Sequence, residues 1–160
     1  MERDGCKNGF TLIELLIVIA IILTLLAVAM PNFFRAREAA NEASAVSSCR
    51  AIITSEVTFS DYYQQGYTST LAQLGPPVSG PPSVTNADLI DSVLASGSKS
   101  GYQFVYTPTA LQGTAYSSYG VNANPSDLGV TGTRYFFADQ SGVIRFSAAA
   151  VATASDSPLD

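Results

Sequence analysis

The amino-acid sequence predicts an α+β protein in which one long N-terminal helix packs on a small antiparallel sheet. An apolar run covers residues 10–30, and helical spacing of apolar residues continues from there to about Tyr63. Four short segments rich in aromatic and β-branched residues follow between residues 102 and 147. Consecutive strands with short connections form antiparallel sheets, and a preceding helix can cover one face of such a sheet.

Composition excludes several classes of function. The 160 residues are 47% hydrophobic and 13% charged, about half the charged share of a soluble domain, so part of the chain is expected to lie outside water. The absence of His excludes His-based triads and His-ligated metals. Two Cys, Cys6 and Cys49, are too few for a disulfide framework. The net charge of −5 argues against nucleic-acid binding by this chain, which needs a basic surface.

Residues 10–30 are predicted to form a transmembrane helix. Thr11, Glu14 and Thr24 interrupt an otherwise apolar run of 21 residues, which is long enough to cross the roughly 30 Å hydrocarbon core of a bilayer. A cleaved secretory signal peptide is the alternative. Its apolar part has about 7–15 residues and ends at a small-residue cleavage site, whereas helical periodicity here continues beyond the run. Basic residues are too evenly divided between the two sides to fix the topology.

Glu14 is a carboxylate inside this apolar run, and a charge at the centre of a membrane helix costs about 2.5–3.5 kcal/mol. No Lys or Arg lies within one helical turn of it. A cut between Gly9 and Phe10 would create an α-amino group four residues before Glu14, on the same helix face. That group could pair within the chain or with a neighbouring chain. The alternative is an interfacial Glu14 that extends to the lipid headgroups.

The segment GFTLIE, residues 9–14, resembles the processing motif of type IV prepilins and type II secretion pseudopilins. The similarity continues through LLIVIAIILTLLAVAMPNF and the following helix, from about Cys6 to Phe59. Gly9 stands before Phe10, Glu14 is the fifth residue after the cut, and Pro31 lies twenty-one residues after Phe10. The combination makes the resemblance specific.

The resemblance implies a pilin fold and a path of maturation. Residues 1–9 would be a leader that a membrane-embedded prepilin peptidase removes after Gly9, and the same enzyme would methylate the new amino group of Phe10. Glu14 would neutralise the Phe10 amino group of an adjacent subunit during assembly. The leader would start in the cytoplasm, with a single span in the bacterial inner membrane and the head outside it.

The resemblance also implies the partners. The chain would form a homopolymer of pilin subunits, and an assembly platform protein and a cytoplasmic ATPase would act on it indirectly. Membrane lipid would surround the helix before assembly, and the assembled filament would be extracellular or periplasmic. The protein would be a building block and a substrate of the peptidase and methyltransferase, not an enzyme, and no cofactor is expected.

Residues 31–63 are predicted to continue the helix as an amphipathic segment, with Pro31 producing a kink because proline removes one helical hydrogen bond. Arg35, Glu38, Glu42 and Glu56 lie mostly off the predicted buried stripe. Cys49 is on it and is expected to be a buried, inert thiol. The stripe has spacings of three or four residues and consists of Ala39, Ala43, Val46, Cys49 (or Arg50), Ile53 and Val57.

Residues 64–160 are predicted to form the globular α+β head. Residues 67–75 read as one short helical turn, and Asn86 as the cap of a helix through Ala95. Strands are expected at 102–106, 115–121, 134–138 and 143–147, with the last two forming a hairpin around the turn sequence DQSG. The tail, residues 148–160, is small and polar and is expected to fray.

Asp127 and Asp139 are the candidate metal ligands, because some secretion pseudopilins bind calcium in a loop of the head. Calcium takes six to eight oxygen ligands, and the sequence has no acidic cluster of the D-x-D-x-D kind. Both residues stand in turn-forming sequences, where isolated Asp residues usually serve the turn itself. No metal site is therefore predicted.

Three functions compete. A structural subunit of a type IV pilus is the leading hypothesis, and a pseudopilin of a type II secretion system is the alternative. The sequence does not separate these two, because they differ in cellular context more than in chemistry. A membrane-anchored enzyme or receptor would need a pocket with convergent polar groups, and the sequence offers no nucleophile–base pair, phosphate loop or metal cluster to fill one.

Overall fold

The computed structural model describes residues 9–113 and 115–159, and the predicted leader, residues 1–9, lies outside this description except for Gly9. The chain forms two compact units, one reaching to Ala36 and the other beginning at Arg37. The elements are the helix α1 (Leu12–Tyr63), the 3₁₀ helix η1 (Leu71–Leu74), the helix α2 (Ser92–Ala95) and the strands β1 (Ser98–Lys99), β2 (Tyr102–Gln112), β3 (Ala115–Pro125), β4 (Tyr135–Asp139) and β5 (Ile144–Ser147).

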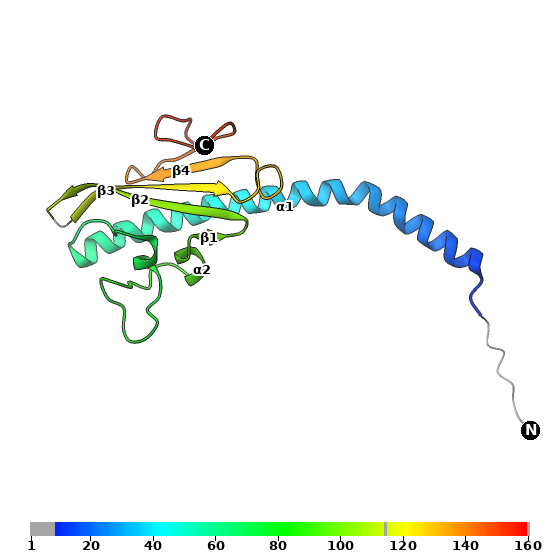
Figure 1. Ribbon diagram of the computed structural model, residues 1–160, viewed down its shortest axis with the longest axis horizontal. Coiled ribbons are helices and arrows are strands. Elements are labelled where there is room, and N and C mark those ends of the chain that lie inside the picture. The colour runs from blue at the N-terminus through cyan, green and yellow to red at the C-terminus, as the bar shows by residue number, and fades with distance from the viewer. Residues whose placement is uncertain (1–8, 114, 160) are drawn as a thin grey trace, which may run out of the picture. The chain divides into compact units, whose positions relative to one another are not determined.

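The second unit has the predicted α+β architecture. Its described strands form one five-stranded sheet in the order β1-β2-β3-β4-β5, with every neighbouring pair antiparallel. The part of α1 within this unit lies along one face of the sheet (Figure 1). A long helix on a sequential antiparallel sheet is a pilin-like fold, and both the helix and the hairpin of β4 and β5 confirm the sequence prediction.

The core lies between α1 and the facing side of the sheet. Alternate strand residues point inward, as the period of two requires, and apolar helix residues meet them. Cys49 is fully buried, and burial raises the pKa of its thiol to about 12, as expected for an inert cysteine. The helix contributes Ala45, Val46, Cys49, Ile52 and Phe59, and the three central strands contribute Tyr102, Phe104, Tyr119, Val121, Ala123, Phe136 and Ala138.

Strand β2 is longer than predicted. The sequence predicts a strand that ends at Tyr106, yet β2 continues through Pro108 to Gln112. Strand β1 pairs with Tyr102 and Gln103, and Phe104 N donates to Gly97 O at 2.8 Å, so among the described residues β2 beyond Phe104 is an open edge of the sheet. Proline is tolerated at such an edge, because no neighbouring strand needs its missing N–H group.

Glu42 is buried on α1, although the predicted stripe left it on the polar side. It is 6% exposed, and its Oε1 atom accepts hydrogen bonds from Thr133 N and Thr133 Oγ1 at 2.8 and 2.9 Å. Its Oε2 atom accepts from Arg134 Nε at 2.8 Å and lies 2.7 Å from Arg134 Nη2. Burial alone would raise the pKa of the Glu42 carboxyl, but these hydrogen bonds hold it below the ordinary value.

Glu56 is the second buried carboxylate that the predicted stripe misplaced. It is fully buried, and it accepts hydrogen bonds from Thr68 Oγ1 at 2.5 Å and Thr68 N at 3.1 Å. Tyr106 donates its hydroxyl to the carbonyl of the same Thr68 at 3.0 Å. Burial raises the pKa of Glu56 more than these bonds lower it. The carboxylate therefore ties the chain just after α1 to the helix itself.

The turn after α1 depends on close backbone contact. Gly66 has a φ of 74°, and a Cβ atom there would lie 2.5 Å from the carbonyl oxygen of Tyr116. Glycine is required by both the left-handed conformation and the lack of space. Because Gly66 approaches β3 so closely, Tyr67 N can donate to Tyr116 O at 2.9 Å. The chain thus crosses directly from the helix to the sheet.

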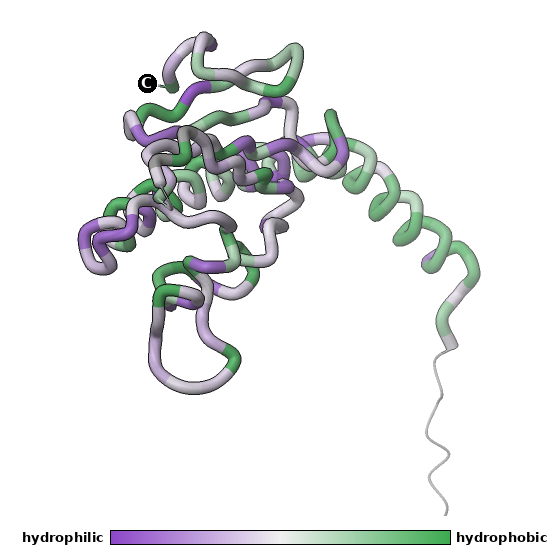
Figure 2. Tube along the Cα trace, turned by 60° about the vertical axis from the view of Figure 1, so that its left-hand side comes forward, coloured by the Kyte–Doolittle hydropathy of each residue, from purple (hydrophilic) through white to green (hydrophobic). Residues whose placement is uncertain are grey.

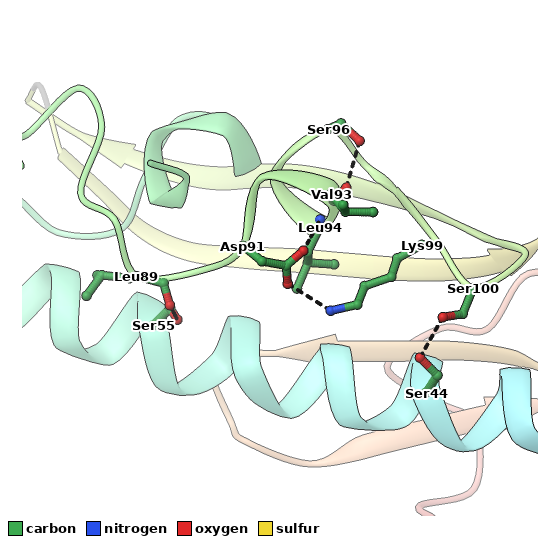
Figure 3. A network of polar contacts seen from close by, with 9 residues as sticks. All are labelled: Ser44, Ser55, Leu89, Asp91, Val93, Leu94, Ser96, Lys99 and Ser100. Atoms are coloured by element: carbon green, nitrogen blue, oxygen red, sulfur yellow. Dashed lines mark hydrogen bonds and ion pairs between the residues drawn. The ribbon is translucent and has the colours of Figure 1, made fainter. Parts of the chain in front are cut away.

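The prediction that a helix begins after Asn86 is wrong, because helix α2 begins only at Ser92. Backbone N–H groups of residues 87–90 donate to the carbonyls of residues 73–75, and Asp88 has a φ of 55°, so this stretch cannot be helical. Helix α2 begins after Asp91, whose Oδ1 accepts from Leu94 N at 3.0 Å, while its Oδ2 lies 2.8 Å from Lys99 Nζ. Figure 3 shows this cap beside two contacts to α1, from Ser44 to Ser100 and from Ser55 to Leu89.

The C-terminal tail packs on the sheet, which differs from the predicted fraying. Phe146 N donates to Ser157 O at 3.0 Å, and Leu159 N donates to Ile144 O at 2.8 Å. Ala152 is 1% exposed, and its carbonyl accepts from Asn122 Nδ2 at 2.7 Å. A small, polar composition predicts fraying only when the backbone has no partners, and here the open edge of β5 supplies them.

Candidate functional site

The predicted cleavage bond lies outside regular structure. Gly9, Phe10 and Thr11 precede the first helical residue, Leu12, and both Gly9 and Phe10 are exposed. A Cβ atom on Gly9 would meet no atom within 4 Å, so its surroundings in the described structure are open. Proteases act on exposed, non-helical chain, and this bond meets that requirement.

Thr11 and Glu14 form a reciprocal cap at the start of α1. Glu14 Oε2 accepts hydrogen bonds from Thr11 N at 2.9 Å and Thr11 Oγ1 at 2.7 Å. Glu14 N donates in turn to Thr11 Oγ1 at 3.2 Å. This is a capping box, in which the side chains of the cap residue and of the third helical residue bond each other's backbone N–H groups. A carboxylate also suits the positive end of the helix dipole.

The role of Thr11 as a helix cap was not predicted from the sequence. The signal was available, because Thr-x-x-Glu directly before an apolar run is the pattern of a capping box. The charge of Glu14 alone does not reveal this hydrogen-bonding role. The two hydrogen bonds from Thr11 both reach Oε2, so Glu14 has a local structural partner that the sequence prediction did not consider.

Within the first unit, α1 is apolar on every side from Leu12 to Met30, apart from Glu14 and Thr24. This stretch is not buried, and by length and composition it is long enough to cross a membrane. Figure 2 colours it as predominantly hydrophobic. Leu12 to Met30 is 19 residues, or about 28 Å at 1.5 Å per residue, close to the thickness of a bilayer core. Thr24 satisfies its hydroxyl within the helix by donating to Ile21 O at 2.8 Å. The segment therefore offers a continuous apolar surface.

Pro31 lies inside α1, and helical structure continues on both sides of it. The neighbouring Asn32 places its side-chain amide 3.4 Å from the carbonyl of Val28, which lies in the turn that the proline ring disturbs. The kink predicted at Pro31 stays a prediction.

The two candidate metal ligands are turn residues. Asp127 accepts from Val130 N and Thr131 N through its backbone carbonyl, at 3.1 and 2.9 Å. Asp139 closes the turn between β4 and β5, where its Oδ1 atom accepts from Ser141 N at 2.9 Å. Among the residues 9–113 and 115–159, no group of three or more His, Cys, Asp or Glu side chains is placed to hold a metal ion.

The exposed bond between Gly9 and Phe10, the capped acidic start and the apolar helix characterise the N-terminal segment. Residues 5–30 match the family model described as the prokaryotic N-terminal methylation motif. The chain also has homologues among type IV major pilins, which agrees with its pilin-like fold.

Two relatives carry this homology. The chain is 47% identical over 70 residues to the type IV wide pilus major component PilA4 of Thermus thermophilus, covering 42% of this chain and 50% of the relative. It is 43% identical over 60 residues to the type IV major pilin protein PilA of Myxococcus xanthus, covering 37% of this chain and 27% of the relative. The matched region thus spans half or less of the length of each relative. No solved structure matches the chain significantly.

Proposed function

We propose that the protein is the precursor of a type IV pilus subunit that is cleaved after Gly9, methylated on the amino group of Phe10 and polymerised through its apolar helix. The observation that carries this proposal is the match to the methylation motif at residues 5–30, together with a helix from Leu12 to Met30 whose apolar side chains are exposed all round. The homology to type IV major pilins supports a pilus over a pseudopilus.

Cleavage after Gly9 places a new ammonium group next to the start of α1. Thr11 bonds Oε2 of Glu14, and these bonds leave Oε1 open to a second donor. The amino group of Phe10 from an adjacent subunit is that donor in the proposed filament. A paired carboxylate and ammonium can be buried among apolar helices, where either charge alone would be costly.

The apolar helix of the subunit is stable in two environments, the membrane and the filament. In the bacterial inner membrane, with the leader on the cytoplasmic side, lipid covers residues 10–30. In the filament, copies of the same helix replace the lipid, and apolar surface stays away from water in both states. A prepilin peptidase, an assembly platform protein and a cytoplasmic ATPase are the partners that this path requires.

The test uses the full chain in its native host. Surface filaments are sheared, viewed by electron microscopy and identified by their peptides, in the wild type and in the variants Gly9→Asp and Gly5→Asp. We expect surface filaments built from this chain in the wild type and in Gly5→Asp, which changes a glycine away from the cut. Gly9→Asp should accumulate uncleaved precursor without filaments.

Two results would overturn the proposal. Short filaments confined to the periplasm would assign the protein to the pseudopilins. A functional monomer that keeps residues 1–9 would make the apolar helix a plain membrane anchor.

A further inference from the structure

The sheet face opposite α1 carries a concavity of about 360 Å³ over β2, β3 and β4. Along these strands the inward residues, such as Tyr106 and Val121, belong to the core. Their neighbours point to the other face because side chains alternate along a strand. Apart from Tyr119, whose side chain belongs to the core, the concavity is therefore formed by outward residues that the core does not use.

Gly120 creates the hollow. The register places Thr107 of β2 and Asp139 of β4 on either side of Gly120, in one row across the sheet. The central position of that row has no side chain. The ring of Phe137 leans over it, since a Cβ atom at residue 120 would lie 3.2 Å from Phe137 Cε2. Glycine weakens a strand interior and often marks a place where a ligand approaches the backbone.

Polar groups surround the aromatic ring. Thr109 Oγ1 and Ser118 Oγ form a cross-strand pair 2.8 Å apart at one side of the hollow. The hydroxyl of Thr107 and the amide of Gln140 also line it, and Asp139 supplies the one charged side chain of the lining. These groups can both donate and accept hydrogen bonds, except the carboxylate, which accepts.

We propose that this concavity binds a neutral pyranose saccharide. The C–H bonds of a pyranose ring form an apolar face that packs on an aromatic ring such as Phe137, whose π face is electron-rich. The hydroxyl groups of the sugar match a rim of hydroxyls, an amide and a carboxylate. Asp139, with no Lys or Arg in the lining, disfavours acidic sugars.

The inference goes beyond the proposed function, because a filament subunit needs no saccharide site in order to assemble. In a polymer the site would repeat along the filament. Many weak sites on one filament bind a polysaccharide far more tightly than one site does.

The test uses saturation-transfer difference NMR to measure saccharide binding to the full chain. The chain is held in dodecylphosphocholine micelles, which contain no sugar. Cellohexaose and chitohexaose are the neutral probes, and a galacturonic acid oligomer is the acidic control. We expect saturation transfer to the ring protons of a neutral probe, with a Kd on the order of 1 mM, and weaker binding of the acidic one.

Two variants of β4 form a matched pair. Phe137→Leu keeps an apolar side chain but removes the aromatic face, and it should weaken binding by about tenfold. Tyr135→Leu removes an aromatic two residues away on the same strand face, outside the lining of the concavity, and should leave binding unchanged. Thr107→Val removes one rim hydroxyl without changing the shape, and should weaken binding even if Phe137→Leu fails to fold.

The proposal is overturned if neither neutral probe receives saturation at about ten times the expected Kd. It is also overturned if Phe137→Leu and Thr107→Val both bind as the wild type does, or if Tyr135→Leu weakens binding as much as Phe137→Leu.

Discussion

Glu14 accepts two hydrogen bonds from Thr11, from its backbone N–H at 2.9 Å and its hydroxyl at 2.7 Å. The residue proposed to pair with a neighbouring subunit is thus also part of the capping box at the start of α1. The two roles differ in what they need, because a cap needs an acceptor oxygen whereas charge pairing needs a carboxylate. Substitutions can therefore separate them.

Glu14→Gln should prevent assembly, whereas Thr11→Ala should permit it. Glutamine keeps an oxygen that can accept from Thr11 but carries no charge, so the variant should be processed and inserted but should not form filaments. Thr11→Ala removes the cap, at a cost of about 1 kcal/mol, and keeps the carboxylate, so filaments should still form. Filament yield in sheared fractions, relative to cleaved subunit in the membrane, is the measurement. Normal filaments from Glu14→Gln would contradict the charge pairing.

Glu42→Gln should destabilise the head in a pH-dependent way. The bonds from Thr133 and Arg134 hold the pKa of Glu42 below its ordinary value, so their contribution is present above the unfolded pKa of about 4.3. It is lost as the pH falls through the lower folded pKa. We expect a loss of about 1–2 kcal/mol in the free energy of unfolding at pH 7, limited because Arg134 is 38% exposed.

Urea denaturation of the full chain in micelles, followed by tyrosine fluorescence, measures this difference from pH 7 down to pH 3. The stabilities of wild type and Glu42→Gln should converge in acid. A difference that stays constant over this range would show that the carboxylate charge contributes nothing.

Tyr119→Phe should stabilise the protein. The Tyr119 hydroxyl is buried and has no hydrogen-bond partner within the part of the chain that the structure describes, so its removal should raise the free energy of unfolding by about 1 kcal/mol. Tyr106→Phe is the matched control, since this hydroxyl donates to Thr68 O at 3.0 Å, and its loss should cost about 1 kcal/mol. Equal effects of the two changes on the denaturation midpoint would argue against the orphaned hydroxyl.

Cys49 should report on both folding and processing. Its thiol is buried with a pKa of about 12, so in the native state it should react with iodoacetamide at least about 100-fold more slowly than after unfolding. Cys6 lies within the proposed leader, so two alkylations are expected in the unfolded precursor and one in the unfolded mature protein. Rapid native labelling of Cys49 in mature protein, counted by mass spectrometry, would mean that the helix does not pack as described.

The sequence was sufficient where structure depends on local pattern. A uniformly apolar run predicts the long helix from its own composition, and the β4–β5 hairpin follows from DQSG between two β-prone segments. The motif around Gly9 and Glu14 is contiguous, so a single stretch of residues was enough to recognise it. Each of these predictions needs no knowledge of distant partners.

The errors occurred where distant residues decide the outcome. Glu42 and Glu56 are buried because Thr133, Arg134 and Thr68 satisfy their carboxylates, and no spacing along the helix reveals those partners. Residues 87–90 are not helical, although the sequence predicts a helix there, because their N–H groups donate to the carbonyls of residues 73–75. The hollow over Gly120 depends on the register of three strands, which the sequence does not specify.

The intact mass of the protein isolated from surface filaments tests the central claim most directly. The account predicts a single species that begins at Phe10, lacks residues 1–9 and carries one additional methyl group. A filament protein whose mass includes residues 1–9, or one that begins at any residue other than Phe10, would contradict it.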